Sequence, residues 1–139
     1  NFRKEFVVDG ETYKLAIADT DGALECIPVV EKYCQMSHGF YMVYSVTSKE
    51  SFRRLDEYMS IIVRVKGTEF PLIIVGTKCD LESERQVTQE EGRRYAQKYG
   101  AEWMEISAKT KHNIEESFNT LVRLISDANY DRTFSPSFT

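Results

Sequence analysis

The chain has 139 residues and a mass of 16.1 kDa, a size that suits a single domain. Hydrophobic residues make up 42% and charged residues 29%, a balance typical of globular proteins and unlike that of disordered chains. The formal net charge of −4 leaves no surplus of Lys and Arg for phosphates, so we expect no nucleic-acid partner. Apolar runs stay well short of the roughly 20 residues that span a bilayer, and residues 1–5 do not resemble a signal peptide.

The cysteines and histidines offer no convincing zinc site. Cys26, Cys34 and Cys79 lack metal-type spacing, and the only histidines are His38 and His112. An odd number of free thiols is typical of a reducing compartment, so we expect an intracellular, cytoplasmic protein.

The first predicted elements form a hairpin. Two β-type stretches, Phe2–Val8 and Glu11–Ala18, are separated by Asp9-Gly10. Asp-Gly accepts the positive φ angles of a tight type I′ turn, so we expect the two strands to be antiparallel.

Three later runs read as buried strands: Phe40–Val46, Leu72–Val75 and Trp103–Ile106. Each run is short and rich in β-branched or aromatic residues, as parallel strands covered on both faces tend to be.

Amphipathic helices are predicted between and after these runs. One apolar stripe comprises Phe52, Leu55, Met59, Ile62 and Val63, and another comprises Ile114, Phe118, Leu121, Val122 and Ile125. Capping-box spacing predicts three helix starts, at Thr47 with Glu50, Thr88 with Glu91, and Asn113 with Glu116. We expect one domain over residues 1–130 and a flexible tail over 131–139, because the tail shows no periodicity.

Alternation of strand and helix predicts an α/β fold, with a mostly parallel sheet flanked by helices and an antiparallel edge hairpin. Ligands of such sheets bind beyond the carboxyl ends of the strands. The predicted strands end in three polar groups, namely Asp19-Thr20-Asp21-Gly22, Gly76-Thr77-Lys78-Cys79-Asp80 and Ser107-Ala108-Lys109. Each group alone is a weak signal, but their order and spacing together are strong.

The order and spacing of these groups resemble the Ras superfamily of small GTPases, and most closely the Ras family. The resemblance runs from Phe2 to about Ser126 and implies the P-loop NTPase-like fold of that family. Further matching segments are Phe2-Arg3-Lys4, Val8-Asp9-Gly10-Glu11-Thr12, Gly39-Phe40, Val43-Tyr44-Ser45, Arg64-Val65-Lys66, Pro71 and Arg85-Gln86-Val87. An unrelated flavodoxin-like protein would require the three motifs to coincide by chance.

The resemblance assigns recognition of the guanine base to the loop after Leu72–Val75. A carboxylate like Asp80 accepts hydrogen bonds from the ring N–H and the exocyclic amine of guanine. Adenine would leave that acceptor unpaired, which implies discrimination of ~10⁴ or more. Lys78 is expected to lie along the base plane and to tie down the phosphate loop, and Thr77 stands where Asn is commoner.

The group Ser107-Ala108-Lys109 is expected to complete the base site. The backbone amide of Ala108 would meet the guanine oxygen, and Lys109 would pack over the base from the other side. An ordinary loop is the alternative interpretation of these three residues.

The resemblance also implies GTP or GDP and Mg²⁺ as cofactors. Asp19 resembles the carboxylate that holds magnesium through a coordinated water, as suits an ion that keeps several waters. Gly22 resembles the residue whose amide meets the γ-phosphate and gives the loop different positions before and after hydrolysis. A solvent-facing turn aspartate is the alternative for Asp19.

The printed chain departs from the family in its phosphate-binding loop. The motif Gly-x-x-x-x-Gly-Lys-Ser/Thr is absent, since no glycine is followed by lysine. The family's first strand, P-loop and first helix are therefore missing from this sequence. We expect an amino-terminally truncated protein rather than a natural minimal domain, and a sheet that lacks a central member and exposes unpaired strand edges.

The second switch segment departs as well. Ala23 stands where the family usually has the glutamine that orients the attacking water, so we assign no catalytic residue and expect slow hydrolysis. Asp21 stands where Ras proteins usually have Ala, and it adds negative charge near the expected γ-phosphate site. Pro28 suits only a first helical turn, and Val29 and Val30 either form an apolar surface patch or pack inward.

Two functional hypotheses follow. The first is a guanine-nucleotide-binding Ras-like signalling switch that hydrolyses GTP, with exchange factors, GTPase-activating proteins and effectors as partners by resemblance. The rival is a non-catalytic pseudo-GTPase or fragment that acts as a protein-interaction module, which Ala23 favours. The printed chain ends in Ser137-Phe138-Thr139 without a prenylation motif, so attachment to the cytoplasmic face of the plasma membrane would need a lipid anchor on a longer parent chain.

Overall fold

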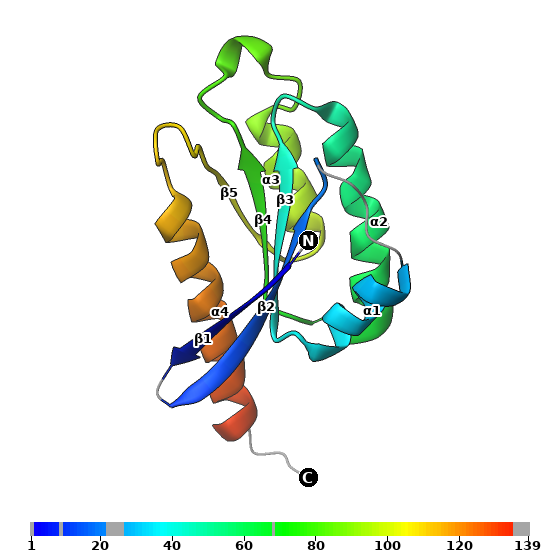
Figure 1. The fold of residues 1–139 in the computed structure, drawn as a ribbon, viewed down its shortest axis with the longest axis vertical. Helices are drawn as coiled ribbons and strands as arrows, with labels where there is room; N and C mark the ends of the chain where they lie inside the picture. Colours follow the sequence, from blue (N-terminus) through cyan, green and yellow to red (C-terminus); the bar gives the residue numbers. More distant parts are fainter. Residues whose placement is uncertain (1, 9, 22–26, 68, 135–139) are drawn as a thin grey trace.

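The computed structural model describes residues 2–8, 10–21, 27–67 and 69–134. Strands and helices alternate along most of the chain (Figure 1). Their order is β1 (Phe2–Val8), β2 (Glu11–Asp19), α1 (Ile27–Met36), β3 (Gly39–Ser45), α2 (Lys49–Lys66), β4 (Leu72–Thr77), the 3₁₀ turn η1 (Glu82–Glu84), α3 (Gln89–Lys98), β5 (Glu102–Glu105) and α4 (Ile114–Phe134).

The described strands form one sheet in the order β1-β2-β3-β4-β5. β1 pairs antiparallel with β2, and the other neighbours are parallel, which confirms the edge hairpin and the mostly parallel sheet. Gly10 has a φ of 81°, as a hairpin turn with positive φ angles requires, whereas Asp9 lies outside the described residues.

The expected gap in the sheet is not present. β2 pairs directly with β3, in parallel, from Leu15 opposite Gly39 to Asp19 opposite Val43. The prediction of unpaired edges beside a missing central strand is therefore wrong for the described residues. Direct pairing satisfies the backbone groups that a gap would have left open.

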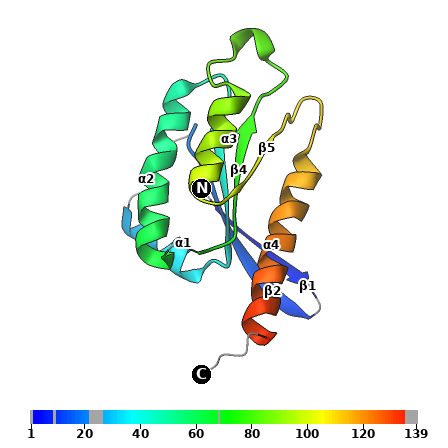
Figure 2. The ribbon, with the colours of Figure 1, turned by 180° about the vertical axis from the view of Figure 1, so that it is seen from behind.

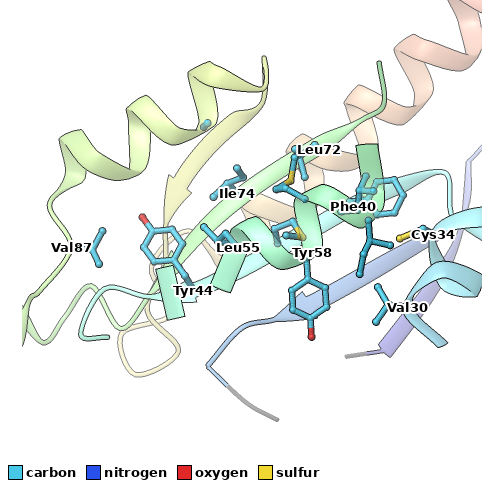
Figure 3. Packing of buried hydrophobic residues seen from close by; sticks show 14 of the residues in the cluster. Val30, Cys34, Phe40, Tyr44, Leu55, Tyr58, Leu72, Ile74 and Val87 are labelled. Carbon is cyan, nitrogen blue, oxygen red and sulfur yellow. The ribbon is translucent and has the colours of Figure 1, made fainter. Parts of the chain in front are cut away.

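The sheet separates two hydrophobic clusters. From β3, Phe40, Met42 and Tyr44 point to the cluster under α1, α2 and α3. The alternate residues Tyr41 and Val43 point to the cluster under α4. Figures 1 and 2 show α4 alone on its face of the sheet, and Figure 3 shows the first cluster at close range. Both faces of β3 are covered, as its apolar run predicted.

One of the three predicted helix caps is confirmed. Thr88 accepts from the backbone amide of Glu91, and the Glu91 carboxylate accepts from the backbone amide of Thr88. The prediction for Thr47 is wrong, because Ser48 caps α2 by accepting from the amide of Ser51. Asn113 is also no N-cap.

Asn113 has a φ of 59°, whereas an N-cap residue is extended. Its side-chain amide donates instead to the carbonyl of Glu105, at 3.2 Å. The residue therefore braces the loop before α4 against the end of β5.

Further predictions concern the end of α4 and the first turn of α1. α4 continues to Phe134, so residues 131–134 are helical rather than part of a tail, and residues 135–139 lie outside the described part. Pro28 does lie in the first turn of α1. Val30 is buried against the core and Val29 is half-buried, which favours inward packing over a patch. Among the described helices, none is long and apolar enough to cross a membrane.

Candidate functional site at the carboxyl ends of the strands

The turn after β2 is held firmly against its neighbours. Thr20 is fully buried, and its amide and hydroxyl both donate to the carbonyl of Val43, at 2.9 and 2.8 Å. Arg54 of α2 donates to the Thr20 carbonyl at 3.2 Å. Asp19 is exposed, and its Oδ1 accepts from the amide of Asp21 at 3.0 Å. These contacts fix where the carboxylates of Asp19 and Asp21 are presented.

The loop after β4 is anchored at two points. Thr77 Oγ1 donates to the carbonyl of Tyr44 at 3.2 Å, and the amide of Cys79 donates to the carbonyl of Ile106 at 3.2 Å. Lys78 between them has a φ of 65°, a left-handed conformation that is uncommon for a lysine. Its Nζ lies 3.2 Å from Oδ2 of Asp21.

The loops after β4 and β5 meet through one side-chain hydrogen bond. Ser107 is fully buried, and its Oγ donates to Asp80 Oδ1 at 2.6 Å. The same Oγ accepts from the amide of Thr110 at 3.2 Å, while Ala108 and Lys109 are exposed. The half-buried Asp80 carboxylate keeps contact with solvent, and an ionised carboxylate offers about four acceptor sites.

A buried ion pair joins the segment after η1 to the end of β5. Arg85 and Glu105 form a two-pronged contact with distances of 2.7 and 2.8 Å, and Arg85 also donates to the carbonyl of Val87. The Glu105 carboxylate is the main cause that raises the pKa of Arg85. Burial raises the pKa of the nearby Cys79 thiol, which therefore stays protonated at neutral pH.

Three described residues with a strained backbone conformation lie in the loops after β4 and β5. The non-glycine residues with positive φ among those described are Lys78, Lys111 and Asn113, and all three lie in loops that follow β4 or β5. Such conformations cost of order 1–3 kcal/mol and persist where surrounding contacts hold them, often at functional sites. Their clustering makes the loops after β4 and β5 candidates for a functional site.

The structure places the predicted site residues at the last positions of β2 and β4 and on the loops that follow β4 and β5. These strands run parallel within the sheet, so their carboxyl ends lie at one edge. The residues placed there are Asp19, Thr77, Lys78, Asp80, Ser107, Ala108 and Lys109. Side-chain contacts join Asp80 to Ser107 and Lys78 to Asp21. Gly22 and Ala23 lie outside the described residues.

Sequence reasoning missed the residues that hold this edge together. Arg54 belongs to the solvent-facing side of the α2 pattern, and nothing in that pattern indicates that it reaches the Thr20 carbonyl. The two hydrogen bonds from Thr20 to the carbonyl of Val43 depend on the direct pairing of β2 with β3, which was not expected. The Asp21–Lys78 ion pair joins two motifs that were read separately.

The donor set fits a guanine nucleotide with magnesium in part. Asp80 offers a positioned carboxylate, and the exposed turn at Ala108 offers backbone groups. In the described part of the chain, no three His, Cys, Asp or Glu side chains gather as a metal site. The single carboxylate of Asp19 fits an ion such as Mg²⁺, which takes one or two protein carboxylates and keeps waters and phosphates as its other ligands.

The comparison with family models decides the identity of the fold. The model described as the Ras family matches residues 1–127. The chain belongs to the Ras family. Its mixed five-stranded sheet is thus the α/β fold of the Ras-like P-loop GTPases, and the expected membership among small GTPases is confirmed.

Curated relatives agree with this membership in the Ras family. The chain is 39% identical over 139 residues to "Ras-like protein" of Laccaria bicolor, a match that covers 99% of this chain and 66% of that protein. It is 43% identical over 128 residues to "Ras-like protein 1" of Saccharomyces cerevisiae, which covers 91% of this chain and 41% of the yeast protein. The chain therefore spans less than two thirds of the length of these relatives.

Proposed function

We propose that this Ras-family protein binds guanine nucleotides at the strand-end edge and acts as a GTP/GDP signalling switch. The observation that carries the proposal is the 2.6 Å hydrogen bond from Ser107 to Asp80, which joins the two loops that match the family's base-recognition motifs. A buried serine that holds one oxygen of the carboxylate leaves the other to face a ligand in a fixed direction.

Base selection is assigned to the loops after β4 and β5. Asp80 accepts from the ring N–H and the exocyclic amine of guanine, and adenine cannot supply this pair of donors. The backbone amide of Ala108 meets the guanine oxygen, and the chains of Lys78 and Lys109 flank the base. Thr77, which donates to the Tyr44 carbonyl, holds the start of the loop in place.

Phosphate and metal binding are assigned to the turn after β2. Asp19 would hold Mg²⁺ through a coordinated water, and the amide of Gly22 would meet the γ-phosphate. The ion neutralises charge on the phosphates when it is bound. Arg54 and Thr20 keep the Asp19 turn in place, so the carboxylate needs little reorganisation on binding.

Hydrolysis is proposed to be slow. Ala23 stands where the family's glutamine orients the attacking water, and a methyl group makes no hydrogen bond to water. The same residue favours a second candidate function, a pseudo-GTPase that binds partners without cycling.

Partners and location follow from family membership as proposals. They are exchange factors, GTPase-activating proteins and effector proteins, in the cytoplasm or at the cytoplasmic face of the plasma membrane. Membrane attachment would depend on a lipid anchor outside the printed sequence.

The test is nucleotide binding by the wild type and by Asp80→Asn. We expect labelled GDP to bind the wild type and to be displaced by GTP but not by ATP. Asn puts an N–H₂ donor against guanine's own donors, so the variant should bind GDP on the order of 10²-fold more weakly or worse. Glu84→Gln, which removes one charge from exposed η1, is the matched control. Displacement by ATP as readily as by GTP, or unchanged binding by Asp80→Asn, would refute the proposal.

A further inference from the structure

The ion pair between Asp21 and Lys78 joins two segments that the proposed function keeps apart. Asp21 follows β2, in the turn assigned to the phosphates and magnesium. Lys78 follows β4, in the loop assigned to the base. Their charged atoms are 3.2 Å apart, and both side chains are exposed, at 36% for Asp21 and 49% for Lys78.

Both partners of this pair are held by their backbones. Asp21 is positioned by the bond from its amide to Asp19 and by the buried Thr20 beside it. Lys78 is held by its left-handed conformation and by the bond from the amide of Leu81 to its carbonyl, at 3.0 Å. The ordered backbones fix where the two side chains begin, so the ion pair costs only the conformational entropy of the side chains themselves.

We infer that Asp21 acts as an internal competitor of the nucleotide for Lys78. The inference rests on the proposed function and concerns the regulation of the same site. While the Asp21 carboxylate holds Nζ, the lysine is drawn toward the end of β2 and away from the base. A bound nucleotide must break this contact before Lys78 takes up its proposed place beside the base and the phosphate loop.

Asp21 also opposes the nucleotide directly, because its charge has the same sign as the phosphates. The two effects point in the same direction but differ in one respect. Competition requires Lys78, whereas repulsion between Asp21 and phosphate does not. A double-mutant cycle therefore separates them.

The experiment measures the Kd for GDP of the wild type, Asp21→Asn, Lys78→Met and the double variant. Asn is close to isosteric with Asp, so Asp21→Asn removes the charge and little else. We expect it to tighten GDP binding by about 2- to 5-fold, the upper part of the range that an exposed ion pair supports. In the Lys78→Met background the same substitution should have a clearly smaller effect. The gain should also shrink at 1 M salt, which screens the pair.

Glu90→Gln is the control, because it removes a carboxylate that pairs with Arg93 and Arg94 on α3 and with neither Asp21 nor Lys78. It should leave the Kd unchanged. Equal Kd values for the wild type and Asp21→Asn, or an equal gain with and without Lys78, would overturn the competitor role alone. Failure of every variant to bind GDP would overturn the proposed function and this inference together.

Discussion

Ser107 holds two loops together from a position without solvent contact. Its hydroxyl donates to Asp80 and accepts from the amide of Thr110, so its removal leaves both partners short of one bond. Sequence reasoning placed Ser107 beside the base site but gave it no partner. Under the proposed function, its hydrogen bond makes Ser107 a positioning residue that acts through Asp80.

We predict that Ser107→Ala weakens GDP binding by about 10-fold. The loss corresponds to one hydrogen bond to a charged group, about 1.5 kcal/mol. The measurement is the Kd for labelled GDP, with Ser83→Ala as the control, because Ser83 is an exposed serine of η1. Selectivity for GDP over ADP should fall as well, since Asp80 loses its fixed direction. If affinity and selectivity both stay at wild-type values, the Asp80–Ser107 bond has no role in recognition.

The proposal that GTP hydrolysis is slow rests on Ala23. We predict that Ala23→Gln raises the single-turnover rate of GTP hydrolysis, by on the order of 10²-fold in the presence of a GTPase-activating protein. The gain comes from a side-chain amide that can orient the attacking water. The Kd for GTP should change little, which separates catalysis from binding. A wild type that an activator already stimulates strongly would contradict the proposal of slow hydrolysis.

At the scale of the element, α3 packs closely on the sheet at Gly92. A Cβ there would lie 2.3 Å from Trp103 Nε1 and 2.3 Å from Tyr44 Oη. These two groups are hydrogen-bonded to each other at 3.1 Å, and burial raises the pKa of Tyr44 to about 12. The Tyr44 hydroxyl thus stays protonated at any physiological pH, so its hydrogen bond with Trp103 beside Gly92 does not change with pH.

We predict that Gly92→Ala destabilises the protein by about 1–3 kcal/mol, although alanine is the better helix former by about 1 kcal/mol. The cause is overpacking against Trp103 and Tyr44. Urea unfolding followed by Trp103 fluorescence measures the change. Gln97→Ala, at an exposed position of the same helix, controls for helix propensity. A more stable Gly92→Ala variant would show that the helix shifts freely.

The capping box of α3 makes a pH-dependent contribution. Hydrogen bonding from the Thr88 amide is the main cause that lowers the pKa of Glu91 below its usual 4.5. A carboxyl whose pKa is lower in the folded state stabilises the fold above its unfolded pKa, and this stability is lost as the pH falls through the folded pKa.

We therefore predict that Glu91→Gln costs about 0.5–1 kcal/mol of unfolding free energy at pH 7, and less below pH 4.5. Urea unfolding at the two pH values measures the difference. Glu102→Gln, at an exposed position of β5, is the comparison. A cost that is the same at both pH values would mean that the charge of Glu91 is not what stabilises the cap.

At the scale of the whole molecule, α4 covers one face of the sheet by itself (Figure 2). Leu121 and Ile125 are buried, Phe118 stacks on Tyr41 with ring centroids 4.3 Å apart, and Tyr41 shares a 2.6 Å hydrogen bond with Ser117. Docking of α4 is thus what closes the second hydrophobic cluster.

We predict that Leu121→Ala costs about 2–5 kcal/mol of unfolding free energy, because it leaves a cavity against the sheet. Asn119→Ala, on the exposed side of the same helix, should cost little. Thermal unfolding followed by circular dichroism compares the two variants with the wild type. Equal melting temperatures for Leu121→Ala and the wild type would show that α4 contributes little to the fold.

The elements were predictable from sequence because their patterns are local. The stripe containing Leu55 and Ile62 needs only helical periodicity to be recognised. The apolar runs of β3 and β4 are recognised by their short length and their β-branched or aromatic residues. Pairing of β2 with β3 was not predictable, because it depends on which strands are available as neighbours. The predicted site residues that the structure describes lie at one edge of the sheet, as the rule for parallel strands indicated. The contacts of Lys78 with Asp21 and of Arg54 with Thr20 depend on long side chains whose directions no pattern records.

The central claim is that guanine nucleotide occupies the strand-end edge. The most direct measurement is to denature natively purified protein and to identify any released nucleotide by chromatography. We predict GDP or GTP at close to one equivalent per chain, because the proposed function assigns the selection of guanine to Asp80 and its partner loops. Protein that releases no nucleotide, or that releases an adenine nucleotide, would contradict the account.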